Sequence, residues 1–247
     1  RPKESWDHKL RRLMTYFEED TQLRDILITG GDALMSQNKT LHNILEAVYR
    51  MACRKRKANQ ARPDGEKYAE LQRVRLGSLE PLVADEAFAR SLSEMPGLAR
   101  QFHLSLQSGS AGVLKRMNRR YSPEEYLAAC ETLRRFMPEC AITTDIIAGF
   151  PGETEQEFEE TEAFIQRVRF ARIHVFPYSR RSGTRADRME NQVPESVKHE
   201  RGQKLIQIGN KMETEYVYNS VGTVQRVLFE QPAGEGLAEG YTGEYIR

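Results

Sequence analysis

Apolar and polar positions fall into two alternating kinds of segment along the chain. Short runs rich in Ile, Leu and Val recur between longer stretches with helical periodicity. This is the pattern of parallel strands joined by crossover helices, and it predicts an α/β fold. We expect strands at Asp25–Thr29, Arg73–Gly77, Phe102–Leu106, Thr143–Ala148 and Arg172–Phe176. We expect helices at Lys39–Arg56, Asp85–Glu94, Pro123–Phe136, Glu155–Arg169 and about Pro194–Tyr216.

Local signals indicate where several of these helices start. Asn38, Ser122 and Thr154 each stand at the start of a helical stretch and have side-chain oxygens that can cap a helix N-terminus. The connection Arg54–Gln72 is long, with many charges and a Pro-Asp-Gly turn. We therefore expect that connection to be solvated.

The C-terminal part of the chain has a different pattern. After Tyr218, short strand-like pieces at Thr223–Glu230 and Tyr241–Ile246 surround Gly234, Gly236 and Gly240. Short strands separated by glycine turns predict a small β appendage.

The turns after the expected strands contain the unusual residues. In a parallel barrel, the loops at the C-terminal ends of the strands build the active site. We therefore expect the five turns of this chain to converge on one site. They lie at 29–35, 77–81, 107–110, 149–153 and 177–183.

Composition and charge exclude several classes of protein. The chain has 247 residues, 39% of them apolar, and a formal net charge of +1, so attraction to nucleic acid must come from local patches. Cys53, Cys130 and Cys140 are not clustered, which argues against a disulfide scaffold or a zinc site and favours the cytoplasm. No apolar run is long enough to span a bilayer. A start at Arg1 without targeting character indicates a fragment.

The first two turns combine glycine with polar groups. Gly30 and Gly31 follow a buried strand and precede Asp32, so backbone groups and a carboxylate could receive the ammonium group of a ligand. Ser78 and Glu80 follow the next strand and could hydrogen-bond a ribose or an amino acid. Equally, Asp32 could be a solvated acid in a tight turn, Ser78 a helix cap, and Glu80 a surface acid.

The third turn contains Gln107 and is followed by a basic stretch. The Gln107 side chain can donate and accept hydrogen bonds at once. Residues 115–120 include four basic side chains and precede Tyr121, so this stretch could grip phosphate and stack on a base. A solvated charged face is the more common reason for such a run. We expect His103, inside a strand, to be a satisfied core histidine.

The fourth turn ends an apolar strand that contains an acid. Gly149 and Gly152 surround Pro151, and such a turn can bring backbone groups close to adenine or ribose. Asp145 needs a partner or a place at the barrel interior, because burial of an unpaired charge costs several kcal/mol. A structural salt bridge would explain Asp145 equally well.

In this order, the strand-end motifs resemble the barrel of the radical S-adenosylmethionine enzymes. Residues 30–32 resemble the glycine motif of the second strand, which the resemblance implies binds the methionyl amino group. Residues 145–149 resemble the fifth-strand motif near the adenine. From Arg73 onward the chain resembles the tRNA methylthiotransferases, especially those that act on threonylcarbamoyladenosine beside the anticodon.

The resemblance implies a reaction, a cofactor and a partner. In an intact enzyme, S-adenosylmethionine is cleaved reductively, a 5′-deoxyadenosyl radical abstracts hydrogen from adenine, and sulfur is inserted. The implied partners are tRNA and an electron donor, and the implied metal group is a 4Fe-4S cluster. We assign cofactor contacts to Gly30, Gly31, Asp32, Ser78, Glu80, Gln107, Asp145 and Gly149, and RNA contacts to Arg119 and Tyr121.

The first part of the chain resembles a different family. Residues 5–10 and 25–36 resemble the lysine 2,3-aminomutases, which are also radical enzymes, and the two resemblances meet near 73–78. Both families place CxxxCxxC after the first barrel strand, and the chain has no such spacing. The methylthiotransferases' second-cluster domain and the aminomutases' pyridoxal-binding lysine are also missing. We expect the three cysteines to be small buried residues.

We therefore predict an incomplete parallel (β/α)6-type barrel over residues 1–218 and the start of a TRAM-like RNA-binding β domain over 219–247. The predicted function is methylthiolation of threonylcarbamoyladenosine in tRNA. Three alternatives remain: a non-catalytic tRNA-binding module, an aminomutase-type fragment, and a chain whose two parts cannot share one core. Salt-dependent tRNA binding without S-adenosylmethionine binding would favour the first, and pyridoxal phosphate binding the second.

Overall fold

The computed structural model describes residues 6–29 and 38–247. The helices are α1 (Trp6–Glu19), α3 (Asn38–Asn59), α4 (Glu86–Ser93), α5 (Ala111–Arg116), α6 (Pro123–Phe136), α7 (Glu155–Val168) and α8 (Glu195–Tyr218). Short 3-10 turns are η1 (Asp64–Glu66), η2 (Pro81–Val83) and η3 (Ala186–Arg188). The strands are β1 (Asp25–Thr29), β2 (Arg73–Leu79), β3 (Leu98–Leu104), β4 (Ala141–Ala148), β5 (Arg172–Pro177), β6 (Leu228–Gly234) and β7 (Leu237–Tyr241).

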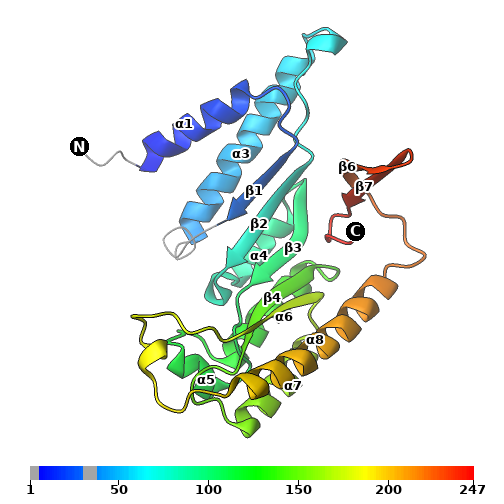
Figure 1. Ribbon diagram of the computed structural model, residues 1–247. Coiled ribbons are helices and arrows are strands. Elements are labelled where there is room, and N and C mark those ends of the chain that lie inside the picture. Colours follow the sequence, from blue (N-terminus) through cyan, green and yellow to red (C-terminus); the bar gives the residue numbers. More distant parts are fainter. Residues whose placement is uncertain (1–5, 30–37) are drawn as a thin grey trace.

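Five parallel strands form one sheet in the order β1-β2-β3-β4-β5, which is also their order in the sequence (Figure 1). β1 pairs with β2 from Asp25–Arg73 to Thr29–Gly77, and β4 pairs with β5 from Thr143–Arg172 to Ala148–Pro177. All five strands therefore end at the same edge. This confirms the predicted α/β class, with helices between parallel strands as in part of a barrel.

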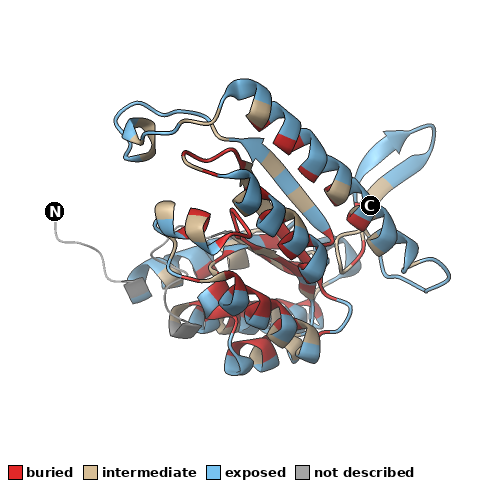
Figure 2. Cartoon of the chain, turned by 90° about the horizontal axis from the view of Figure 1, so that it is seen from below, coloured by how far each residue is buried: buried red, intermediate tan, exposed pale blue. Residues whose placement is uncertain are grey.

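The two faces of the sheet differ in polarity. Ile26, Leu76, Phe102 and Ile142 point to one face and belong to a single hydrophobic cluster that also contains side chains of α3, α4, α6, α7 and α8. Buried positions accordingly gather between the strands and the helices (Figure 2). The other face, which we call the inner face, has mainly polar side chains. They are Arg75, Gln101, His103, Thr143, Asp145, Arg172 and His174.

The N-terminal segment shares this core. Met14 of α1, Ile26 of β1 and Leu41 of α3 lie in the same cluster as residues of β2, β3 and β4. The expected alternative, in which the two parts of the chain fail to share a core, is not favoured by this packing.

The capping signals predicted helix starts correctly. Ser122 and Thr154 each accept a hydrogen bond from the third residue of their helix, and Glu125 and Glu157 complete capping boxes. α3 begins at Asn38. Two helices of the structure, α1 and α5, were not predicted from the sequence.

The predicted bounds of the third strand were wrong. β3 runs from Leu98 to Leu104 and not to Leu106. Past Leu104, polar side chains replace the strand ladder: the Tyr121 hydroxyl donates to the carbonyls of Ser105 and Leu106, and the Leu106 N–H donates to Thr144 Oγ1. The chain rejoins the sheet only at Gln107, which forms an isolated bridge with Ile146.

The C-terminal residues form a separate antiparallel hairpin, β6-β7. The strands are shifted from their predicted positions, because residues 234–236, all with positive φ, make the turn. The Arg73 guanidinium donates to the Tyr241 carbonyl at 2.6 Å and ties the hairpin to β2. The domain boundary at 219 remains a prediction. Within the described residues, no helix is long and apolar enough to cross a membrane.

Candidate functional site

Three predicted site residues lie at the C-terminal ends of neighbouring strands and share an unusual backbone. Ser78 is the second-last residue of β2, Gln107 follows β3 and Gly149 follows β4, with φ angles of 54°, 72° and 72°. Positive φ is uncommon for residues other than glycine, and such strain tends to gather at binding sites. This shared backbone geometry supports a site at this edge of the sheet, where the sequence predicts one.

Gln107 has a free side chain at this edge. Its N–H donates to the Asp145 carbonyl at 2.9 Å, and its own carbonyl accepts from Ile147 N–H at 2.9 Å. Its backbone is therefore committed to the sheet. Among the described residues, the side-chain amide has no hydrogen-bond partner, so it can bind a ligand.

The Gly149 turn is fixed by a buried carboxylate. Glu153 Oε2 accepts from the Gly149 N–H at 2.8 Å and pairs with Arg201 at 2.8 Å. The two side chains of the pair are 1% and 7% exposed. Burial raises the pKa of Glu153, although the Gly149 N–H and Arg201 oppose the shift. No role was predicted for Glu153, although it lies in the expected turn 149–153 and directly follows the Pro151-Gly152 pair.

Packing against another side chain explains why position 149 is a glycine, and this contact was not predicted from the sequence. A Cβ there would lie 2.4 Å from Cγ of Lys198, and φ is +72°. Lys198 is 2% exposed and pairs with Glu195 at 2.6 Å. The Lys198 side chain therefore occupies the space that a side chain at position 149 would need. The expected close approach of a ligand to Gly149 stays a prediction.

Tyr121 has a structural role in the loop after β3. It is 5% exposed, and its hydroxyl donates to the carbonyls of Ser105 and Leu106. Burial raises its pKa to about 12, with a lowering effect from Arg119 and a raising effect from Glu80. In this structure the Tyr121 ring is not exposed for stacking on a base, so the RNA contact expected of it is not favoured.

The basic stretch 115–120 is only partly available to a partner. Arg116 forms a two-pronged pair with Glu157, at 3.0 and 2.6 Å, and also donates to the Gly152 carbonyl at 3.1 Å. Burial tends to raise the pKa of Glu157, but the hydrogen bonds from Arg116 and Thr154 and the charge of Arg116 together outweigh burial, so the pKa is lowered. Arg116 thus holds α5 against the turn after β4, whereas Lys115 and Arg120 are exposed.

A chain of contacts between polar side chains crosses the inner face. Gln101 donates to Thr143 Oγ1 at 3.0 Å, His103 Nδ1 lies 3.1 Å from the same oxygen, and His103 Nε2 lies 3.4 Å from Asp145 Oδ2. The partner expected for Asp145 is therefore His103. Arg75, Gln101, His103 and Thr143 line a cavity of about 620 Å³ on this face.

The first predicted turn of the site cannot be compared with the other turns. Gly30, Gly31 and Asp32 lie outside the described residues, and the described strand before them ends at Thr29, opposite Gly77.

The residues at this edge fit S-adenosylmethionine in one respect: Gln107 and Ser78 place polar side chains at adjoining strand ends. They would offer hydrogen bonds to its polar groups.

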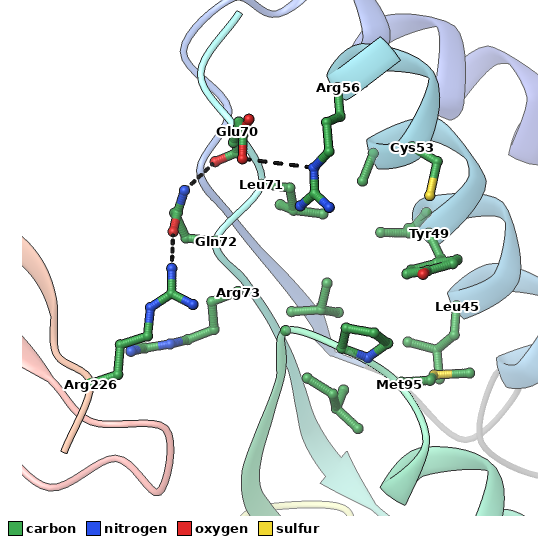
Figure 3. Close-up of a pocket in the computed structure, with 16 residues that line it drawn as sticks. Leu45, Tyr49, Cys53, Arg56, Glu70, Leu71, Gln72, Arg73, Met95 and Arg226 are labelled. Carbon is green, nitrogen blue, oxygen red and sulfur yellow. Dashed lines mark hydrogen bonds and ion pairs between the residues drawn. The ribbon is translucent and has the colours of Figure 1, made fainter. Parts of the chain in front are cut away.

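The cysteines do not fit a 4Fe-4S cluster. Cys130 and Cys140 are buried, and burial raises their pKa to about 12 and about 11. Cys53 is exposed, contrary to expectation, and lines a separate cavity of about 230 Å³ between α3 and the residues before β2 (Figure 3). Within the described residues, no group of three His, Cys, Asp or Glu side chains could hold a metal.

The family follows from sequence comparison. Residues 2–165 match the model of the radical SAM superfamily. The chain belongs to this superfamily, as the strand-end motifs predicted, and it is an enzyme by family.

The relatives of the chain within this superfamily include tRNA methylthiotransferases. The chain is 38% identical over 181 residues to the threonylcarbamoyladenosine tRNA methylthiotransferase MtaB of Bacillus subtilis, covering 72% of this chain and 40% of the relative. It is 41% identical over 172 residues to the tRNA-2-methylthio-N(6)-dimethylallyladenosine synthase of Streptomyces coelicolor, covering 70% and 34%. The chain thus spans well under half the length of these relatives, whose names do not favour the aminomutase alternative.

A solved structure supports the fold. Coproporphyrinogen III oxidase (HemN) from Escherichia coli, a radical SAM enzyme, matches 85% of this chain and 47% of its own, with a TM-score of 0.59 and 14% identity. At this identity the match concerns the fold alone.

Proposed function

We propose that the protein contributes to S-adenosylmethionine-dependent methylthiolation of an adenosine in tRNA, at C2 of threonylcarbamoyladenosine beside the anticodon. The observation that carries the proposal is the 38% identity to a methylthiotransferase of that specificity. It is supported by polar and strained residues at the strand edge where a parallel α/β fold binds its ligands.

Within this proposal the residues have separate roles. Gly30, Gly31 and Asp32 would hold the methionyl part of the cofactor, and Ser78, Glu80 and Gln107 would bind its polar groups. Asp145 and Gly149 would lie near the adenine. S-adenosylmethionine, when bound, would supply the methyl group and the reactive carbon, while these side chains orient it.

The partners of the proposed reaction are tRNA and an electron donor, and its place is the cytoplasm. Arg119 would contact the RNA. For Tyr121, we replace the expected RNA contact with positioning of the loop after β3, because its hydroxyl bonds two carbonyls of that loop.

The test compares modified nucleosides in a source strain that lacks the gene. Bulk tRNA is digested and analysed by mass spectrometry, before and after return of the wild-type gene. We expect loss of the methylthio form of threonylcarbamoyladenosine and its recovery on complementation. The methylthio form of dimethylallyladenosine is the control and should not change. If it alone changes, the proposed specificity is wrong, and if neither changes, the activity is wrong.

A further inference from the structure

The loop between β5 and α8, residues 178–194, has an excess of positive charge. It contains four arginines and two acids, Asp187 and Glu190. Arg180 donates to Asp187 through Nε, at 2.9 Å to Oδ1, and through a terminal nitrogen, at 2.9 Å to the carbonyl. Asp187 is therefore neutralised by Arg180. The remaining guanidinium groups are exposed and have no acidic partner in the described part of the chain. They belong to Arg181, Arg185 and Arg188.

The loop is fixed in shape although it is exposed. Tyr178 N–H donates to the Ala148 carbonyl at 2.8 Å, and the Asn191 carbonyl accepts from Gly152 N–H at 2.9 Å. The Gln192 amide donates to the carbonyls of Ala186 and Met189, at 3.0 and 2.9 Å. Because the backbone is already ordered, a partner that binds the arginines need not order it.

The loop lies beside the candidate site and beside the basic stretch. Its Asn191 contact joins it to the turn after β4, and Arg116 of α5 donates to Gly152 in the same turn. Figure 1 shows the loop, in yellow, next to α5 at the C-terminal edge of the sheet. The exposed Lys115 and Arg120 and the three unpaired arginines thus flank one turn of the candidate site.

We propose that Arg181, Arg185 and Arg188 form a phosphate-binding surface that holds the RNA backbone while the target base reaches the inner face of the sheet. Guanidinium groups bind phosphate oxygens through paired hydrogen bonds, and such contacts position an RNA without reading its sequence. This surface extends the RNA contact beyond Arg119 and rests on the proposed function, since it assumes a tRNA substrate.

The experiment measures RNA binding as a function of salt. The triple variant R181Q/R185Q/R188Q is compared with wild type by fluorescence anisotropy, using an anticodon stem-loop RNA that contains threonylcarbamoyladenosine. Each phosphate contact contributes about 0.7 to 0.9 to the slope of log K against log salt. We expect the slope of the variant to fall by about 2 and its Kd to rise at least tenfold at low salt.

A matched control removes the same charge elsewhere. The variant K57Q/R167Q/K211Q neutralises three exposed basic residues on α3, α7 and α8. It should bind RNA within about twofold of wild type, because its charges lie on helices away from the strand edge. Equal weakening of both triple variants would overturn the assignment to the loop.

The outcomes separate the two proposals. If wild type binds the RNA with a salt-dependent Kd and the loop variant binds equally well, the phosphate surface is wrong and the proposed function stands. If wild type does not bind the RNA at any salt concentration, both are wrong. Circular dichroism and thermal unfolding of each variant confirm that the binding change does not come from loss of the fold.

Discussion

On the inner face of the sheet, Nε2 of His103 on β3 lies 3.4 Å from Oδ2 of Asp145 on β4. Thr143 Oγ1 lies 3.1 Å from the other ring nitrogen, so both nitrogens of the imidazole have partners. The side chains of His103 and Asp145 are 17% and 31% exposed. The pair is therefore ordered yet within reach of a ligand. A role in ligand binding can be tested separately from a contribution to the stability of the fold.

Asp145→Asn should impair function more than folding. Because the pair is partly exposed, its loss should change the free energy of unfolding by less than about 1 kcal/mol in urea titration. Loss of a charge-assisted hydrogen bond to a ligand costs about 1.5 to 3 kcal/mol, so the methylthio nucleoside should fall at least tenfold in the complementation assay. Glu86→Gln, which removes an exposed pair with Arg135, is the control and should keep full yield. Full yield from Asp145→Asn would contradict the site assignment.

Glu153 and Glu155 share one partner, Arg201, but differ in burial. The side chain of Glu153 is 1% exposed and that of Glu155 is 61% exposed. Glu153→Ala should lower the free energy of unfolding by about 3 to 5 kcal/mol, because it leaves Arg201 and the Gly149 N–H buried without this acceptor. Glu155→Ala should cost less than about 1 kcal/mol. Urea unfolding of both variants measures the difference, and equal losses would show that Glu153 does not anchor the turn.

Local sequence signals predicted those parts of the fold that depend on neighbours in the chain. Ser122 with Glu125 and Thr154 with Glu157 are spaced as capping boxes, and both helices start where this spacing predicts. The strand-end turns were likewise found because glycine and polar residues follow apolar runs. Ser78, Gln107 and Gly149 then gathered at one edge, as parallel pairing requires.

Features that depend on distant contacts could not be predicted in this way. The early end of β3 depends on hydroxyls of Tyr121 and Thr144, which lie 15 and 38 residues from Leu106. The reason for glycine at 149 is Lys198, on α8. In the sequence, the basic residues of the stretch 115–120 could not be told apart as free or paired. In the structure, Glu157 on α7 neutralises Arg116 on α5. Each of these required the tertiary arrangement.

Tyr121 should stabilise the fold in a pH-dependent manner. Its pKa is raised from 10.0 to about 12, chiefly by burial, so the folded state favours the protonated phenol. Its contribution is therefore full below pH 10 and is lost as the pH rises from 10 through 12, by up to about 1.4 kcal/mol per pH unit. Unfolding in urea at several pH values, wild type against Tyr121→Phe, measures this. A difference between the two proteins that stays constant up to pH 11.5 would contradict the burial.

Two glycines should respond in opposite ways to alanine. A Cβ at Gly109 would lie 2.7 Å from Phe164 Cβ and 2.8 Å from Thr161 Cα, so Gly109→Ala should lower the free energy of unfolding by about 1 to 3 kcal/mol. Gly202 lies within α8 with nothing within 4 Å of the added atom. Gly202→Ala should therefore raise stability by up to about 1 kcal/mol through helix propensity. Thermal unfolding gives both signs, and a stabilising Gly109→Ala would show that the loop after β3 is not packed against α7.

The three thiols should react in two classes. Cys53 is exposed, whereas burial raises the pKa of Cys130 to about 12 and that of Cys140 to about 11. Because the thiolate is the reacting form, the buried thiols should react with a disulfide reagent at pH 8 on the order of 100-fold more slowly than Cys53. Cys53→Ser should abolish the fast phase, and all three cysteines of wild type should react rapidly in denaturant. A fast phase that persists in Cys53→Ser would mean that one of the buried thiols is accessible in the folded protein.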